Sequence, residues 1–218
     1  MDIERINDFW VPSNDVHIED WKAKTGSFTQ NKCLEKFKTH CKVREIKLKT
    51  VLDIGAWCGT WSHAMHEYAE HIVAFEPDPL HVKCLKLNLK RITNCTIRNE
   101  AVGDKEGLVS LTNDDFTQAK RIADTPGQLK MITLDQLEYD NVEMIKIDVE
   151  GYEMNVLEGA KKLLASPNLK FLMIELNNNT KKYGSSNLEI EKYLDKMGFE
   201  IMIKVWPDVV WRKKGKRK

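Results

Sequence analysis

The chain has 218 residues, a length that suits one large domain, and it combines a hydrophobic fraction of 42% with 31% charged residues. This composition is typical of a globular protein and excludes a disordered, collagen-like or coiled-coil chain. No apolar run approaches the roughly 18 residues of a membrane-spanning helix. The five cysteines include no C-x-x-C pair that would indicate a zinc site. We therefore expect a cytoplasmic protein with neither a membrane span nor a disulfide framework.

The charges are unevenly distributed along the chain. The totals are 34 lysines and arginines and 33 aspartates and glutamates, but residues 212–218 (RKKGKRK) carry six of the positive charges. Residues 1–211 therefore have 28 basic and 33 acidic side chains. We predict one domain over 1–211 and a basic tail without fixed structure over 212–218. Such a tail can contact nucleic acid or an anionic surface, or it can simply increase solubility.

Residues 1–49 are predicted to form a leader and a first helix. Residues 1–27 are aromatic and irregular. We interpret them either as a lid over a ligand site, with His17 near Trp10, or as a strap packed on the helices. The spacing of Leu34, Phe37 and Cys41 predicts a helix over 28–43.

Further along the chain, apolar segments rich in β-branched residues alternate with segments of helical periodicity. This alternation is typical of an open, mostly parallel α/β sheet. The predicted strands lie at residues 50–54, 71–75, 95–102, 144–148 and 169–176. The predicted helices among and after them lie at residues 79–91, about 154–164, and 187–197. Two last apolar runs, at 199–206 and 209–211, predict an antiparallel hairpin that closes the sheet.

Residues 51–60 (VLDIGAWCGT) have the pattern of a strand that enters a glycine turn and then a helix. Gly55 and Gly59 permit tight turning and close approach of a ligand to the backbone. Trp57 stands where dinucleotide-binding loops need a glycine to meet the pyrophosphate, and no Gly-Lys-Ser/Thr of a P-loop follows. An adenosine ligand without phosphates, such as S-adenosylmethionine, tolerates both departures.

Acidic residues occur at or just past the carboxyl ends of the predicted strands, where open α/β sheets bind ligands. They are Asp53, Glu76, Asp148 and Glu175. Glu76 follows Gly55 by 21 residues, and a carboxylate there can accept hydrogen bonds from both ribose hydroxyls. It can equally serve as a negative charge at the start of the following helix.

The ordered segments VLDIGAWCGTWS, VAFEPDP, NEAVGDKEG, ITLDQL and IKIDVEGYEMNVLEGA resemble those of the FkbM-type methyltransferases over about residues 50–176. The resemblance implies a Rossmann-like class I methyltransferase fold of the α/β class. This is a mostly parallel sheet of about seven strands with a C-terminal antiparallel hairpin. It also implies S-adenosyl-L-methionine as the cofactor. The residues that it implicates in cofactor binding are Asp53, Gly55, Ala56, Gly59, Glu76, Glu100, Ala101 and Val102. To these we add two candidate contacts: Trp57, whose bulk departs from the family pattern, and Asp148 at the end of its strand.

Methyl transfer from a sulfonium requires alignment of the reacting groups and removal of one proton. Asp148, at the carboxyl end of its strand, is our first choice for the general base or acceptor-orienting residue. Lys146 either assists it or forms an ion pair that ends the strand, and Glu175 forms a second polar cluster with Asn177 at the same edge. Asp148, Glu175 and Asn177 are oxygen donors that suit magnesium, but the resemblance does not require a metal and we expect none.

Three functions are consistent with these features. The first is an S-adenosylmethionine-dependent O-methyltransferase that acts on a hydroxyl of a small molecule or glycan. The second is an RNA ribose 2′-O-methyltransferase, suggested by the basic tail, although Glu175 stands where a second lysine would be expected. The third is a catalytically inactive cofactor-binding module that acts through interactions.

Overall fold

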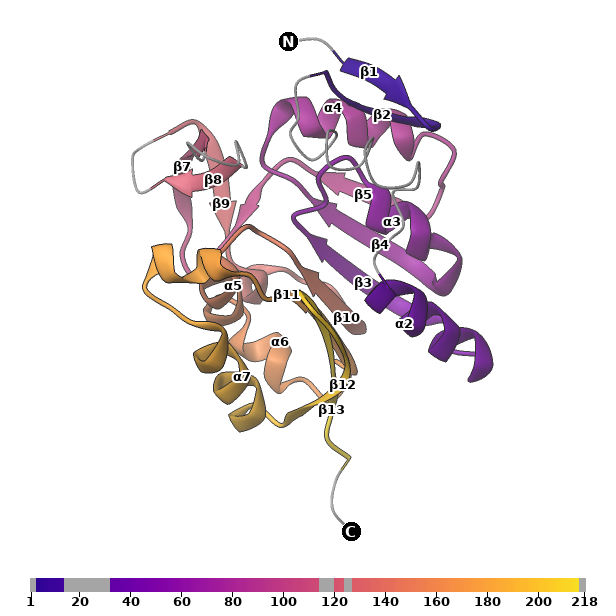
Figure 1. The fold of residues 1–218 in the computed structure, drawn as a ribbon, viewed down its shortest axis with the longest axis vertical. Coiled ribbons are helices and arrows are strands. Elements are labelled where there is room, and N and C mark those ends of the chain that lie inside the picture. The colour runs from indigo at the N-terminus through magenta and orange to yellow at the C-terminus, as the bar shows by residue number, and fades with distance from the viewer. Residues whose placement is uncertain (1–2, 14–31, 114–119, 124–126, 216–218) are drawn as a thin grey trace.

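The computed structural model describes residues 3–13, 32–113, 120–123 and 127–215 and shows a sheet with helices on both faces (Figure 1). The main sheet has seven strands in the order β12-β13-β11-β10-β3-β4-β5. They are β3 (Leu48–Ile54), β4 (Ala69–Phe75), β5 (Cys95–Arg98), β10 (Val142–Ile147), β11 (Phe171–Glu175), β12 (Phe199–Val205) and β13 (Asp208–Lys213). Strands β11, β10, β3, β4 and β5 are parallel, whereas β13 pairs antiparallel with both β11 and β12. This arrangement confirms the predicted fold class.

Helices flank the sheet in two layers. They are α2 (Lys32–Val43), α3 (Thr60–Met65), α4 (Pro79–Asn88), α5 (Glu153–Glu158), α6 (Lys161–Ala165) and α7 (Asn187–Lys196), with short 3-10 turns η1 (His66–Tyr68), η2 (Leu134–Gln136) and η3 (Asn178–Tyr183). Successive residues of a strand point to opposite faces. Val73 and Phe75 of β4 pack with α5, α6 and α7, whereas Ile72 packs with α2 and α3, and Ala74 packs with α4. Because both faces are covered, β10 is buried along its whole length.

Local sequence signals account for where the helices begin. The Asp78 side chain caps α4 by accepting hydrogen bonds from the backbone N–H groups of Leu80 and His81, and Pro79 occupies the first helical position. Ser186 caps α7 by accepting from the Glu189 N–H. The predicted helices at 79–91 and 187–197 therefore form, each ending slightly earlier than expected.

The predicted strand at 95–102 is divided, and this part of the prediction was wrong. The chain leaves the sheet after Arg98 because the Asn99 side chain donates hydrogen bonds to the carbonyls of Glu76 and Pro77, both at 2.9 Å. A second sheet follows in the order β6-β9-β7-β8, on the left of Figure 1. Its strands are β6 (Ala101–Val102), β7 (Gly107–Asn113), β8 (Lys120–Ala123) and β9 (Leu129–Ile132). The sequence patterns did not predict β7, β8 or β9.

The leader forms a hairpin over its described part. β1 (Ile3–Ile6) and β2 (Phe9–Pro12) pair antiparallel and lie beside α4 (Figure 1). This contact corresponds to the predicted strap packed on a helix. His17 lies outside the described residues, so the lid stays a prediction.

The basic tail begins inside the fold, because Arg212 and Lys213 belong to β13. Arg212 forms an ion pair with Glu200 at 2.8 Å across the hairpin. The Lys213 ammonium donates to the carbonyls of Leu164 and Met197, in the last turn of α6 and at the end of α7. The predicted boundary at 211/212 was therefore too early by at least two residues, and residues 216–218 lie outside the described part.

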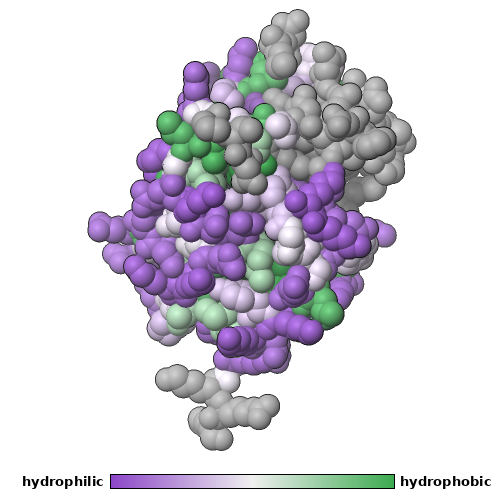
Figure 2. All heavy atoms as spheres, turned by 90° about the vertical axis from the view of Figure 1, so that its left-hand side faces the viewer, coloured by the Kyte–Doolittle hydropathy of each residue, from purple (hydrophilic) through white to green (hydrophobic). Residues whose placement is uncertain are grey.

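On the side shown in Figure 2, hydrophilic residues predominate and the hydrophobic ones form small separate groups. Within the described ranges, no helix combines the length and the apolar character needed to cross a bilayer.

Candidate functional site

A cavity of about 320 Å³ lies at the carboxyl ends of β3, β4, β10 and β11, a volume at the lower end of the range for small-molecule sites. Ten of the twelve residues that the sequence singles out line it. They are Gly55, Ala56, Trp57, Glu76, Glu100, Ala101, Val102, Lys146, Asp148 and Glu175. Asp53 and Gly59 are outside the lining, Asp53 because its side chain lies buried beneath the glycine loop.

The glycine loop between β3 and α3 requires its two glycines. Gly55 has a φ of +77°, and a Cβ there would lie 1.8 Å from the backbone oxygen of Asp148. Gly59 has a φ of +86°, and a Cβ there would lie 2.5 Å from Leu85 Cδ1 of α4. Gly55 therefore lets the ends of β3 and β10 approach closely, and Gly59 lets α4 pack against the start of α3.

Glu76 connects the glycine loop to the end of β4. Its Oε2 accepts a hydrogen bond from the Trp57 N–H at 2.9 Å, and its Oε1 accepts from the Asp78 N–H at 2.9 Å. His81 Nδ1 lies 3.4 Å from the same Oε1. A carboxylate has about four acceptor positions, so Glu76 retains capacity for the two hydroxyls of a ribose. Trp57, at a φ of +49°, places its side chain in the cavity lining.

These features fit S-adenosylmethionine better than a dinucleotide. The carboxylate of Glu76 suits a ribose diol, and the acidic edge beyond it suits a ligand that carries sulfonium and ammonium charges. Trp57 fills the place where a pyrophosphate would need open backbone. The loop and Glu76 would hold the methionine and ribose parts of S-adenosylmethionine.

Glu100 lies at the side of the cavity where we expect the adenine of the cofactor, and it forms ion pairs with two cations. Its Oε2 lies 2.5 Å from Arg98 Nε, and its Oε1 lies 2.7 Å from Lys130 Nζ. Burial alone would raise the pKa of Glu100, but hydrogen bonds and charge from Lys130 and Arg98 outweigh it and lower the pKa. The Glu100 carboxylate is engaged in these two ion pairs. The neighbouring apolar side chains of Ala101 and Val102 therefore form the part of the cavity wall that suits an adenine ring.

Lys146 forms a buried ionic network beneath the loop. Its Nζ lies 3.0 Å from Asp53 Oδ1 and 3.7 Å from Asp148 Oδ2, and it donates a hydrogen bond to the Gly55 carbonyl at 2.6 Å. Ser62 Oγ donates to the other oxygen of Asp53 at 2.6 Å. Burial would lower the pKa of Lys146, but the charges of Asp53 and Asp148 outweigh it and raise the pKa. Lys146 is therefore a cation that ties the loop to Asp148.

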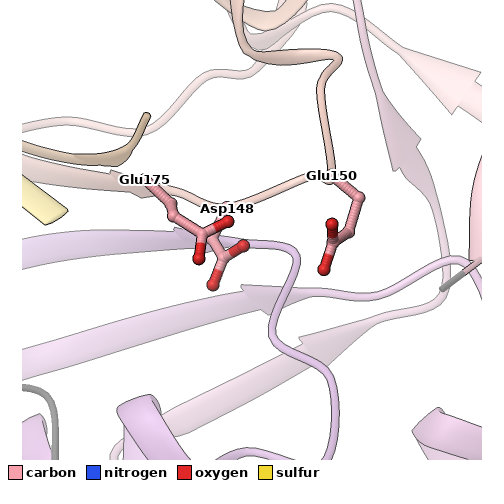
Figure 3. Close-up of side chains that lie close together, drawn as sticks. All are labelled: Asp148, Glu150 and Glu175. Carbon is pink, nitrogen blue, oxygen red and sulfur yellow. The ribbon is translucent and has the colours of Figure 1, made fainter. Parts of the chain in front are cut away.

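Three carboxyl groups lie close together where β10 and β11 end (Figure 3). Asp148 follows β10, Glu150 lies in the turn after it, and Glu175 ends β11; one oxygen of each lies within 4.8 Å of the others. The negative charge of Asp148, followed by burial and the charge of Glu150, raises the pKa of Glu175 to about 10. Glu175 is thus protonated at neutral pH and can donate a hydrogen bond.

Asn177 does not join this cluster in the way the sequence suggested. Its Nδ2 donates to Glu175 Oε2 at 2.8 Å, and its Oδ1 accepts from the Asn179 N–H at 2.9 Å. It therefore presents a donor to the carboxyl groups, and Glu150 supplies the third carboxyl oxygen instead.

Glu153 shapes the turn that carries Asp148 and Glu150. It is fully buried, and its Oε1 accepts hydrogen bonds from the N–H groups of Gly151 at 2.9 Å and Val149 at 3.3 Å. Burial raises the pKa of Glu153 to about 7, although the backbone hydrogen bonds oppose the increase. The sequence did not indicate that Glu153 holds this turn, because an acidic residue in the first turn of a helix is common.

The structure adds cavity residues that sequence reasoning did not select. They come from α2, α3, the first turn of α4, the second sheet, β11 and the start of β13: Leu34, Trp61, His81, Leu111, Ile122, Met173 and Asp208. His81 could have been found from its place in the first turn after Glu76. Leu111 and Ile122 belong to strands that the apolar pattern does not reveal.

Comparison with known proteins agrees with this geometry. The sequence matches the methyltransferase FkbM domain over residues 53–201. A search among curated proteins found no match.

Three solved structures share the fold at low sequence identity. The FkbM methyltransferase from Methylobacillus flagellatus KT is 17% identical, with a TM-score of 0.56; the alignment covers 76% of this chain and 43% of that longer protein. An rRNA methylase from Streptococcus thermophilus is 16% identical, with a TM-score of 0.52 and coverage of 82% and 95%. A protein of the NADB-Rossmann superfamily from Streptococcus agalactiae is 16% identical, with a TM-score of 0.52 and coverage of 88% and 72%.

The domain match extends over well more than half of the chain, and the sheet order and glycine loop agree with it. The chain therefore belongs to the FkbM methyltransferase family and has the Rossmann-like domain of S-adenosylmethionine-dependent methyltransferases.

Proposed function

We propose that this methyltransferase transfers a methyl group to a hydroxyl oxygen of a small molecule or glycan. The observation that carries the proposal is the Asp148–Glu175 carboxyl pair, which lines the cavity where β10 and β11 end, next to Gly55 of the glycine loop. One member of the pair is protonated at neutral pH because its pKa is raised to about 10. Such a pair offers a hydrogen-bond donor and an acceptor to the same substrate group.

S-adenosylmethionine, when bound, supplies the methyl group as an electrophile with a good leaving group. The protein must then hold the acceptor oxygen in line and remove its proton. Asp148 is the general base in this proposal: it accepts the proton of the hydroxyl as the new carbon–oxygen bond forms. Lys146, 3.7 Å away, orients the Asp148 carboxylate.

Protonated Glu175 would donate a hydrogen bond to the acceptor and leave Asp148 free to accept one. The walls around the pair contain apolar and aromatic groups, Leu34, Trp61 and Met173, beside Asp208. These mixed walls suit a sugar or a compact organic alcohol. The five cysteines, all within the described residues, form no disulfide with one another, which is consistent with the predicted cytoplasmic location.

RNA is a less favoured acceptor. Strand β11 ends in Glu175, where a lysine would be expected for ribose methylation, and the cations Arg212 and Lys214 of the tail are paired with acids. A role for the tail in binding nucleic acid stays a prediction. Retention of RNA on a filter at low salt would test binding but not catalysis.

No metal is needed in this mechanism. The three carboxyl oxygens within 4.8 Å of one another would suit magnesium, but protonation of Glu175 and the Lys146 cation already reduce their mutual repulsion. We therefore expect a chelator to leave the rate unchanged. A rate that falls with EDTA and returns with magnesium would replace this proposal with a metal-assisted one.

The first experiment is calorimetric titration of the protein with S-adenosylhomocysteine, the product that the cofactor forms. A panel of hydroxylated acceptors is then incubated with the protein and S-adenosylmethionine, and the S-adenosylhomocysteine produced is measured. Asp148→Asn should lower kcat by about 10²–10⁴-fold and change the Kd for S-adenosylhomocysteine much less. If the variant lost affinity for S-adenosylhomocysteine by the same factor as it lost kcat, Asp148 would be assigned to the cofactor pocket. If wild type binds the product but methylates no acceptor in a broad panel, the inactive binding module becomes the better interpretation.

A further inference from the structure

Asn88, the last residue of α4, bonds at the same time to the N-terminal hairpin and to the glycine loop. Its Oδ1 accepts a hydrogen bond from the Trp10 N–H at 2.7 Å, and its Nδ2 donates to the Trp10 carbonyl at 2.9 Å. The same Nδ2 donates to the Cys58 carbonyl at 2.7 Å. The side-chain amide therefore pairs with both backbone groups of Trp10, as a neighbouring strand would, and uses its other N–H on the loop.

The loop is held through three backbone groups by three side chains from different elements. They are Lys146 on the Gly55 carbonyl, Glu76 on the Trp57 N–H and Asn88 on the Cys58 carbonyl. The first two side chains line the cavity, whereas Asn88 supports the loop from behind. This support matters because Trp57, between Gly55 and Gly59, has a positive φ, which costs free energy unless neighbouring contacts fix it.

The hairpin also packs directly on the loop. Val11 is fully buried and packs with Cys58 of the loop and Cys84 of α4, and Trp10 and Trp57 lie against the same cluster. Hydrogen bonds through Asn88 and apolar contacts through Val11 therefore converge on Cys58. The loop and the hairpin form one packed unit with the end of α4.

We propose that Asn88 is a positioning residue for S-adenosylmethionine binding, through which the docked hairpin Ile3–Pro12 holds the loop in its binding conformation. Removing the Asn88 amide releases the Cys58 carbonyl and lets the loop populate other conformations. The apparent Kd rises by the reciprocal of the binding-competent fraction. This proposal rests on the cofactor site and not on the acceptor chemistry proposed above.

The chain offers a matched control in Asn94. It is half-buried like Asn88, and its Nδ2 also donates to two carbonyls, those of His66 and Ala69, both at 2.9 Å, away from the cavity lining. In calorimetric titrations with S-adenosylhomocysteine, Asn88→Ala should raise the Kd roughly fivefold to tenfold. Asn94→Ala should leave the Kd within about twofold of wild type, even if thermal unfolding shows an equal loss of stability. Equal Kd values for wild type and Asn88→Ala, or equal increases in both variants, would overturn the proposal.

Two further measurements test the coupling itself. Val11→Ala should also weaken binding, and the double variant with Asn88→Ala should weaken it by less than the product of the two single effects, because both act on one unit. In wild type, S-adenosylhomocysteine should slow hydrogen–deuterium exchange of the hairpin amides, since coupling between two sites is reciprocal. Unchanged exchange in the hairpin of a protein that binds S-adenosylhomocysteine overturns the coupling, whatever the variants do. If wild type does not bind S-adenosylhomocysteine at all, the assignment of the cofactor site fails first.

Discussion

Lys146 and Asp53 are direct register partners on the adjacent parallel strands β10 and β3, and their charged atoms lie 3.0 Å apart. Both side chains are almost completely buried, at 6% and 0% exposure. Lys146 lines the cavity, whereas Asp53 lies beneath it, so Asp53 acts on the site through Lys146, which contacts Gly55 and Asp148, rather than through direct contact with a ligand. The pair therefore connects the cofactor loop to the carboxylate that we propose as the base.

Lys146→Met should destabilise the protein strongly. It leaves the buried Asp53 carboxylate without its cation, and loss of one partner of a buried pair costs about 3–5 kcal/mol. Chemical denaturation measures the change in the free energy of unfolding. The double variant Asp53→Asn/Lys146→Met, which removes both charges, should recover a large part of the loss. A single variant as stable as wild type would show that the pair contributes no net stability.

Glu175→Gln should preserve activity near neutral pH, because glutamine is neutral and can donate a hydrogen bond as protonated Glu175 does. In wild type, Glu175 loses its proton as the pH rises through about 10, which adds a negative charge beside Asp148 and removes the donor. The wild-type rate should therefore fall relative to that of the variant in this range. The ratio of the two kcat values between pH 7 and 11 is the measurement, since the ratio cancels ionisation of the acceptor. A constant ratio would contradict the assigned role.

Glu153→Gln should change how stability depends on pH. A glutamate in the unfolded chain ionises near pH 4.5, whereas the pKa of Glu153 in the folded protein is about 7. Between these values the folded protein binds the additional proton, so wild-type stability falls as the pH rises and the loss is complete above about pH 7. The variant lacks this contribution and should gain about 3 kcal/mol relative to wild type across the window. Denaturation curves at pH 4.5 and pH 7.5 provide the comparison, with Glu70→Gln on β4 as the exposed control.

Glu76→Gln should weaken cofactor binding without unfolding the domain. An amide places an N–H₂ group against the N–H of Trp57 or Asp78, where the carboxylate accepts hydrogen bonds from both. Loss of charge-assisted hydrogen bonds should raise the Kd for S-adenosylhomocysteine by about 10–100-fold. Asp78→Ala removes the cap of α4 from the same turn and should lower the melting temperature with a smaller change in Kd. The reverse order of effects would move Glu76 from ligand binding to structure.

The sequence was sufficient to predict the strands that bury apolar side chains on both faces. β3, β4, β10 and β11 are covered on both faces, so their apolar runs are unmistakable, and the predicted parallel sheet is confirmed. β7 lies in the second sheet, and its Leu108 is 63% exposed. A strand that buries little surface leaves a weak hydrophobic pattern, which is why this sheet was not predicted.

The site was predictable in its position but less so in its electrostatics. Strand ends and the glycine loop indicate where Glu76 and Asp148 lie, because carboxyl ends of parallel strands share one edge. The Asp53 side chain can be buried because its register partner on the adjacent strand is Lys146. The protonation of Glu175 depends on the charges of residues in neighbouring segments. These relationships join residues far apart in the chain, so no local pattern reports them.

At the start of the basic tail, contacts with carbonyls and carboxylates make the electrostatic effect of the basic side chains smaller than their number suggests. The last-turn carbonyls of two helices together carry about one negative elementary charge, and the Lys213 ammonium lies against carbonyls at the ends of α6 and α7. Arg212 and Lys214 face the carboxylates of Glu200 and Asp195. Beyond a screening length of about 8 Å, each of these groups is nearly neutral. An approaching polyanion would therefore experience far less attraction from residues 212–214 than their three formal positive charges suggest.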